Sequence, residues 1–166
     1  HEAVRIDADP SESYVVAKEI SAYAADKGFD MVLLGKETIS YNGSEVGGML
    51  AEFMNLPYIS LASKLEVNGD TATLDRSIEG GSEVVDVKMP FVASASKGMA
   101  EQRIPNMRGI MAARTKPLEV VEPAACDDLV SFESYSLPEA KSACKYVEPD
   151  DMAELVSLLH NEAKVI

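Results

Sequence analysis

The sequence has few basic residues, few cysteines and no long apolar run, and each shortage excludes a class of protein. Fifteen lysines and arginines against 28 acidic residues give a net charge of -13, so a phosphate backbone would be repelled and we predict no nucleic-acid binding. Two cysteines, Cys126 and Cys144, are too few for a disulfide scaffold and suggest free thiols in a reducing compartment. No apolar run reaches the roughly 18 to 20 residues of a membrane span, and we predict none.

The side chains that acid–base and nucleophilic enzymes need are also scarce. His160 is the one histidine after His1, and no second His or Cys lies at ligand spacing from it, so we expect a structural role and no metal site. Ser82 lacks the GxSxG pattern, and neither cysteine belongs to a CxxC motif. We therefore predict no catalytic residues in this chain.

What remains is an ordinary globular composition, with 46% hydrophobic and 26% charged residues in a chain of 166. Residues 3–7 alternate as a half-buried strand does, and residues 11–27 have helical spacing. Residues 31–35, MVLLG, form the nearly pure apolar run expected of a strand buried in a parallel sheet. We interpret these three segments as a βαβ unit, followed by a helix over 45–55.

Beyond Pro57 the pattern changes to short strands separated by turns. Residues 58–63 and 64–67 read as two strands, and the turn residues at 68–70 and 79–82 predict two hairpins. A further strand, PFVASAS, follows. We expect an α/β fold in which hairpins extend a parallel sheet.

The second half of the chain contains a short helix and an acidic tail. The helix is expected after Pro105, and residues 118–121 could form another strand. Residues 117–166 hold eleven acidic and three basic residues, which makes this segment a distinct piece. Residues 150–162 predict a terminal helix with an apolar face.

The polar segment between the strand at 31–35 and the helix at 45–55 is the main candidate binding site. In open α/β sheets ligands lie at the carboxyl ends of strands, and a helix N-terminus offers unpaired N–H groups to a phosphate. Four glycines would allow close approach of a ligand to the backbone here: Gly35, Gly43, Gly47 and Gly48. The segment matches neither Walker A nor GxGxxG, so an ordinary connecting loop stays an alternative, and Lys36 could face a phosphate or solvent.

Residues 97–116 form a basic segment inside the acidic chain, with five basic residues and the single acid Glu101. The segment could be a solvated helix face, or it could dock an acidic partner or an anionic cofactor. Its apolar residues could belong to the core or to a hydrophobic interaction patch. They are Met99, Ile104, Met107, Ile110 and Met111.

Several segments, in order and spacing, resemble the beta subunit of electron transfer flavoprotein. Residues 30–36, DMVLLGK, look like the family's strand leading into its nucleotide loop. Residues 76–85, RSIEGGSEVV, together with 90–92, PFV, look like its signature. Residues 103–107, RIPNM, resemble the end of its partner-recognition loop, where Ile104 takes the place of a leucine that docks into acyl-CoA dehydrogenases. The resemblance covers nearly the whole chain.

The resemblance implies a Rossmann-like fold of the adenine-nucleotide-hydrolase type, with a parallel sheet, β-hairpins and a C-terminal extension. The family's opening strands would lie upstream of His1, so we expect an N-terminally truncated subunit with an incomplete sheet. Residues 1–116 would be the C-terminal part of the nucleotide-binding domain, and 117–166 the acidic C-terminal extension with its terminal helix.

The resemblance also implies a function. The subunit would pair with an alpha subunit that holds the redox FAD, would itself bind a structural AMP or a second FAD, and would perform no bond chemistry. The heterodimer would pass electrons between dehydrogenases, such as acyl-CoA dehydrogenases, and a downstream acceptor, in the cytoplasm or in a mitochondrial matrix. The implied docking residues are Arg103, Ile104 and Pro105. The implied nucleotide-binding residues are Gly35, Lys36, Thr38, Ser40, Asn42, Gly43, Glu45, Val46 and Gly47.

Two alternatives stay open beside this reading. One is a universal-stress-type nucleotide-binding module without a redox role, and the other is a fragment that binds no ligand. The hairpin block at 65–88 distinguishes the first, because such modules continue their parallel sheet directly. The nucleotide loop departs from the family pattern, since 40–42 read Ser-Tyr-Asn in place of an acidic run and 45–46 read Glu-Val in place of Gln-Thr.

Overall fold

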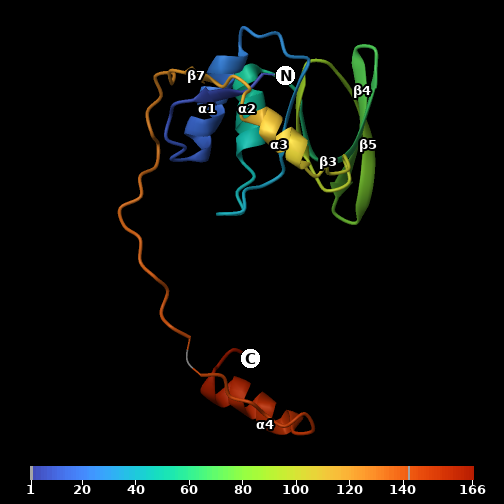
Figure 1. Cartoon of the computed structure of the whole chain (residues 1–166). Coiled ribbons are helices and arrows are strands. Elements are labelled where there is room, and N and C mark those ends of the chain that lie inside the picture. Colours follow the sequence, from blue (N-terminus) through green and yellow to red (C-terminus); the bar gives the residue numbers. More distant parts are fainter. Residues whose placement is uncertain (1, 142) are drawn as a thin grey trace. The chain divides into compact units, whose positions relative to one another are not determined.

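The computed structural model describes residues 2–141 and 143–166 and contains two compact units, one ending at Ser131 and one spanning Phe132–Ile166. The first unit is a mixed α/β structure (Figure 1). In chain order its elements are β1 (Val4–Ile6), α1 (Ser13–Ala24), β2 (Met31–Gly35), α2 (Val46–Met54), β3 (Tyr58–Asn68), β4 (Thr71–Ile78), β5 (Gly81–Lys88), β6 (Phe91–Ala95), α3 (Met107–Ala113) and β7 (Glu119–Val121).

The main sheet has five strands in the order β2-β6-β3-β4-β5. The β2–β6 and β6–β3 pairs are parallel, whereas β3–β4 and β4–β5 are antiparallel hairpins. The hairpin turns contain Gly69 and Gly80, whose φ angles of +65° and +81° are ones that glycine adopts without strain. The two predicted hairpins are therefore confirmed, and in Figure 1 β4 and β5 lie at the end of the unit away from β7.

The prediction that β1, α1 and β2 form a βαβ unit of one sheet is wrong for the residues that the structure describes. β1 pairs in parallel with β7 in a separate two-stranded sheet, and β2 pairs with β6. Strand and helix positions follow from local patterning, but strand partners depend on which segments meet in space. Nothing in the sequence of β1 distinguishes a β7 partner from a β2 partner.

The two strands expected at 58–63 and 64–67 form one strand, β3. Its first half pairs with β6 and its second half with β4, and the register shifts between them. At the shift Leu61 has a φ of +57°, a left-handed conformation that is costly for a side chain of this kind. The Leu61 N–H donates to the Ser94 hydroxyl at 3.0 Å, and Ser94 is 1% exposed. The bulge is thus held by a buried side chain of β6.

Helices α1 and α2 lie side by side and pack on one face of the sheet (Figure 1). Leu50 and Ala51 of α2 meet Ala17 of α1 and Val92 of β6 in one buried cluster. The neighbouring Phe91 belongs to a second cluster with residues of β3, β4 and β5. Successive residues of a strand point to opposite faces, so β6 contributes to a core on each side of the sheet.

One glutamate of α1 and the glutamate directly before this helix hold the chain that follows β7. The carboxylate of Glu19, which is 6% exposed, accepts a hydrogen bond from the Ala124 N–H at 2.8 Å. The carboxylate of Glu12, the residue directly before α1, accepts from the N–H groups of Leu129 and Val130. Residues 124–130 are therefore attached to α1 by backbone hydrogen bonds to side chains.

The second unit contains α4 (Met152–Ser157), which continues as the π-helix η1 (Leu158–Glu162). The Asp151 carboxylate accepts from the Glu154 N–H at 2.9 Å and caps α4. The predicted terminal helix at 150–162 is confirmed in extent, with a π-helical second half. The compositional division between residues 116 and 117 stays a prediction, although residues 119–121 pair with β1. Across 2–141 and 143–166, no helix has the length and apolar character required to cross a membrane.

Candidate functional site

The loop between β2 and α2 is closed on itself by backbone hydrogen bonds. The Thr38 N–H donates to the Gly43 carbonyl at 2.9 Å, and the Asn42 N–H donates to the Thr38 carbonyl at 3.0 Å. The Gly43 N–H donates to the Thr38 hydroxyl at 3.2 Å. Asn42 has a φ of +55°, which asparagine tolerates better than most residues. The loop is therefore an ordered turn that returns the chain to the start of α2.

A hollow of about 200 Å³ lies between this loop, the end of β2 and the first turn of α2. Six of the nine predicted nucleotide-binding residues line it: Gly35, Lys36, Thr38, Gly43, Val46 and Gly47. The other three, Ser40, Asn42 and Glu45, lie in the same loop but do not line the hollow. Leu34, Glu37 and Ser44 line it without having been predicted, although each is a sequence neighbour of a predicted residue.

Two glycines of this site, Gly35 and Gly47, differ in what surrounds the position that a side chain would take. A Cβ on Gly47 would lie 2.7 Å from Tyr58 Oη and 3.0 Å from Leu34 Cδ1, so Gly47 is required by packing inside the unit. We expected Gly47 to be a glycine so that a ligand could approach the backbone, but the space beside it is filled by Tyr58 and Leu34. A Cβ on Gly35 would have nothing closer than the Glu37 carbonyl oxygen at 4.0 Å, so Gly35 leaves open space on the hollow.

The charged side chains of the loop at 35–47 are one basic and two acidic. Lys36 Nζ lies 2.9 Å from Glu37 Oε1, in an exposed ion pair of the kind that contributes at most about 1 kcal/mol. Because both partners are exposed, Lys36 can exchange Glu37 for another anion at small cost. The remaining charged residue of the loop is Glu45, directly before α2. The side chains thus supply one exchangeable cation and one additional carboxylate.

A nucleotide phosphate would fit this site through the backbone. The first N–H groups of α2 have no acceptor inside the helix, and the helix dipole favours an anion at this end. Thr38 and Ser44 add hydroxyl groups at the rim. Residues Val46 and Gly47 would hold the phosphate through their N–H groups, and Lys36 would add a charge. These donors are of the kind that an anionic group requires.

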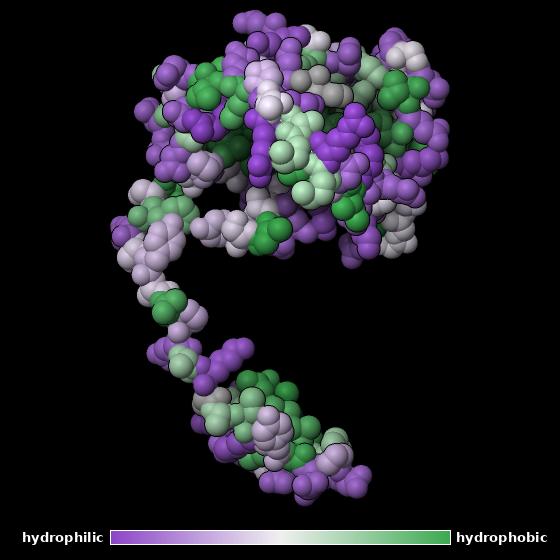
Figure 2. All heavy atoms as spheres, in the orientation of Figure 1, coloured by the Kyte–Doolittle hydropathy of each residue, from purple (hydrophilic) through white to green (hydrophobic). Residues whose placement is uncertain are grey.

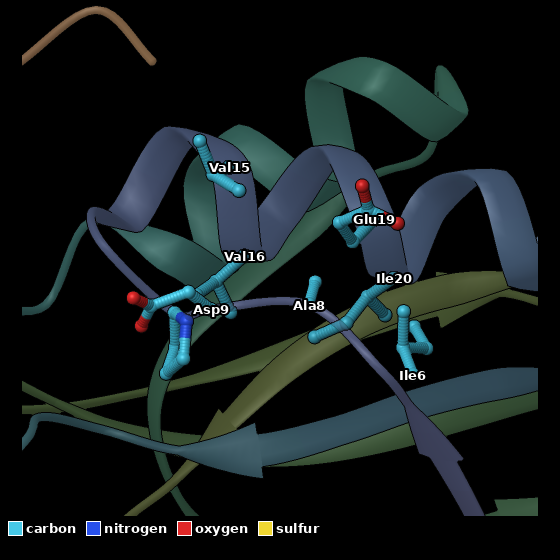
Figure 3. A pocket seen from close by; sticks show the side chains of 8 residues that line it. Ile6, Ala8, Asp9, Val15, Val16, Glu19 and Ile20 are labelled. Atoms are coloured by element: carbon cyan, nitrogen blue, oxygen red, sulfur yellow. The ribbon is translucent and has the colours of Figure 1, made fainter. Parts of the chain in front are cut away.

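A second hollow, of about 140 Å³, lies under α1 and is less suited to an anion. Figure 3 shows Ile6 and Ile20 beside each other beneath the helix, with Val16 on the same side. The polar side chains that line this hollow are Asp9 and Glu19, both acidic. An aliphatic hollow with two carboxylates would repel a phosphate, so we assign no nucleotide to it.

The predicted docking residues Arg103, Ile104 and Pro105 lie between β6 and α3 and are exposed. The Ile104 side chain is 83% exposed, and α3 has no buried residue. Met107, Ile110 and Met111 are exposed as well, so among the alternatives for this segment a core role is excluded for them. Figure 2 shows pale green side chains of this helix next to strongly hydrophilic ones on one face of the unit. Met99 differs, because it packs against the sheet core.

The segment at 76–85 is the part of the β4–β5 hairpin around its turn. Arg76 on β4 pairs with Glu83 on β5, with 3.1 Å between Nη1 and Oε1. Among the described residues, Arg76 Nε has no hydrogen-bond partner although it is buried. The hairpin turn lies at Glu79 and Gly80. These antiparallel strands replace the direct continuation of a parallel sheet that a universal-stress-type module would show.

Comparisons with known proteins agree with these observations. Residues 1–126 match the family described as "Electron transfer flavoprotein domain". The chain is 35% identical to "Electron transfer flavoprotein subunit beta" of Bacillus subtilis, over 96% of this chain and 66% of that protein. It is 32% identical to the subunit of the same name in Syntrophomonas wolfei, over 82% of this chain and 55% of that protein. It is also 32% identical to "Electron transfer flavoprotein subunit beta, mitochondrial" of Oryza sativa subsp. japonica, over 96% and 65%.

The chain spans between about half and two thirds of the length of the curated relatives it matches. The match nevertheless includes β1 to β7, the loop at 36–45 and the β4–β5 hairpin, which are the features that distinguish the first unit. The chain therefore belongs to the electron transfer flavoprotein beta-subunit family.

Proposed function

We propose that this chain is the nucleotide-binding and partner-docking part of an electron transfer flavoprotein beta subunit with a Rossmann-like fold. The subunit forms a heterodimer with an alpha subunit, and the alpha subunit holds most of the redox FAD. The beta subunit binds AMP or a second FAD at the loop between β2 and α2. The heterodimer carries electrons between dehydrogenases, such as acyl-CoA dehydrogenases, and a downstream acceptor, in the cytoplasm or in a mitochondrial matrix.

One observation carries the nucleotide assignment. Inside the family-matched part of the chain, the hollow at the carboxyl end of β2 faces the first turn of α2. This is the position at which open α/β sheets bind ligands, and a helix N-terminus there favours a phosphate. We assign the binding to Gly35, Lys36, Thr38, Gly43, Val46 and Gly47, with Ser40, Asn42 and Glu45 in the surrounding loop.

The proposed role of this chain is binding and positioning. A bound redox flavin supplies the electron chemistry, since it can accept electrons and release them again. The residues of this chain contribute a cradle of N–H groups for the nucleotide phosphate and an exposed segment at 103–105 for a partner. Family membership favours this role over the universal-stress-type alternative.

The proposal is tested by producing the complete beta subunit together with its alpha subunit and measuring released nucleotides by chromatography. We expect one AMP or one additional FAD per heterodimer. Gly35→Asp should lower this content at least tenfold, because it places a carboxylate on the hollow where a side chain has room.

Gly81→Asp is the matched control, since a side chain at Gly81 also meets no atom within 4 Å but lies in the β4–β5 hairpin. It should leave the nucleotide content unchanged. Full nucleotide content in the Gly35→Asp heterodimer would remove the loop from the site, and a heterodimer without bound nucleotide would refute the binding proposal itself.

A further inference from the structure

The residue that precedes α2, Glu45, places its carboxylate between two helix N-termini. Its Oε2 accepts a hydrogen bond from the hydroxyl of Ser13, the first residue of α1, at 3.3 Å. The same oxygen lies 2.8 Å from the position that a Cβ on Gly43 would take. The carboxylate thus occupies the space that the missing side chain of Gly43 leaves, next to the hollow that Gly43 lines.

This carboxylate does not cap the helix that it precedes. Glu45 makes no side-chain hydrogen bond to the N–H groups of α2. The N–H groups of the first turn therefore stay available to a ligand. An anionic ligand that binds them is repelled by the negative charge of Glu45. An anion beside a helix N-terminus is stabilised by the helix dipole, so the carboxylate has a favourable place even without a direct bond.

Within the loop, the charge of Glu45 has no neutralising partner. Residues 35–47 contain one basic and two acidic residues, and the basic Lys36 is paired with Glu37. A phosphate that enters the hollow therefore approaches a site whose net charge is negative. Two like charges a few ångströms apart near a protein surface repel each other by an amount that changes binding severalfold.

We propose that the negative charge of the Glu45 carboxylate weakens the binding of ligands at the nucleotide site, and does so more strongly the more negative charge their phosphate group carries. The inference rests on the proposed function, because it assigns a role to one residue of the same site. The electrostatic cost of binding beside Glu45 rises with the negative charge of the ligand's phosphate group. A phosphomonoester such as AMP carries nearly two negative charges at neutral pH and is penalised more than a singly charged phosphodiester.

The experiment measures dissociation constants by equilibrium dialysis for three adenosine ligands that differ in charge. These are adenosine, the methyl ester of AMP with one negative charge, and AMP. The proteins are the wild-type chain, Glu45→Gln and the control Glu52→Gln, which removes the same charge from an exposed position near the other end of α2. Glu45→Ala is a second variant, and circular dichroism establishes that each protein is folded.

We expect Glu45→Gln and Glu45→Ala to tighten AMP binding about tenfold and methyl-AMP binding about threefold, and to leave adenosine binding unchanged. Glu52→Gln should change each constant by less than twofold. This graded gain with ligand charge is the signature of a competing anion, because a lost hydrogen bond to the ribose would affect all three ligands alike.

Three results would overturn the inference while the proposed function survives. They are unchanged AMP binding in both Glu45 variants, weaker binding of all three ligands, and an equal gain in Glu52→Gln. If neither the wild-type chain nor any variant binds any of the three ligands, the proposed nucleotide site is refuted, and the inference fails with it.

Discussion

Tyr58 fills the space that a side chain at Gly47 would need, with its hydroxyl oxygen 2.7 Å from the position of a Cβ on that glycine. Tyr58 begins β3 and Gly47 is the second residue of α2, so this contact sets how closely the helix lies on the sheet. Gly48 is different, because a Cβ there would meet Tyr58 only at 3.9 Å, an ordinary contact distance. Two adjacent glycines thus have unequal structural roles.

The first prediction compares these two glycines. Gly47→Ala should lower the free energy of unfolding by about 2 kcal/mol, because Tyr58 or α2 must move to make room. Gly48→Ala should raise it by about 0.5 kcal/mol, since alanine favours the helix and has space. Urea denaturation of both variants measures the difference. Equal stability of the two proteins would mean that the Tyr58 contact does not constrain α2.

The second prediction concerns the bulge in β3. Ser94→Ala removes the buried hydroxyl that accepts the Leu61 N–H and leaves this partly buried N–H without its acceptor, at a cost of about 1 kcal/mol. Ser77→Ala, on the exposed part of β4, should change stability by less than about 0.5 kcal/mol. Thermal unfolding of the two variants provides the test, and a Ser94→Ala protein as stable as the control would argue against this role.

The third prediction concerns thiol reactivity. Partial desolvation raises the pKa of the Cys126 thiol, and the nearby Glu19 carboxylate raises it further. A higher pKa leaves a smaller thiolate fraction at pH 8, and the thiolate is the reactive form. Glu19→Gln should therefore increase the rate of Cys126 alkylation at pH 8 about twofold, and the rate at the exposed Cys144 should stay the same. Mass spectrometry of alkylated peptides distinguishes the two sites; a slower reaction at Cys126 would show that the charge of Glu19 is not what limits it.

The fourth prediction separates docking from folding at Ile104. Because its side chain is 83% exposed, Ile104→Ala should leave the melting temperature of the heterodimer within about 1 °C of wild type. If the segment docks a dehydrogenase, the same change should slow electron transfer by an amount that corresponds to roughly 1 to 2 kcal/mol of lost anchoring.

Arg103→Glu serves as the companion variant for docking. It should act on the association rate, and its effect should fade as ionic strength rises. Unchanged electron transfer in Ile104→Ala, with salt-independent behaviour of Arg103→Glu, would place the partner surface elsewhere.

Local patterning predicted most elements of the fold. The apolar run of β2, the helical spacing of α1 and α2, and the turns at Gly69 and Gly80 are all local signals, and the structure confirms these elements. The expected burial of β2 is wrong, because β2 is an edge strand of the sheet and Leu33 is 47% exposed. The pairing of β1 with β7 was missed because it joins segments more than a hundred residues apart. The continuity of β3 was missed because its bulge depends on Ser94, a residue of another strand.

The candidate site could be predicted as a segment but not as a set of contacts. Strand, glycine-rich loop and helix are recognisable in sequence, and the hollow lies where they meet. Why a glycine is required at position 47 could not be predicted from the sequence, because the requirement comes from Tyr58 of a later strand. The position of the Glu45 carboxylate could not be predicted either, because its hydrogen-bond partner Ser13 belongs to α1 and lies 32 residues earlier.

Hydrogen–deuterium exchange of this chain, with and without saturating AMP, tests most directly whether a nucleotide binds at the loop between β2 and α2. A phosphate bound at the first turn of α2 should slow exchange of the amides at 35–48 and leave those of the β4–β5 hairpin unchanged. The Glu45→Gln variant should show the same protection at a lower AMP concentration. Protection confined to residues 6–20 around the hollow under α1, or no protection anywhere, would contradict the assignment of the nucleotide to this loop.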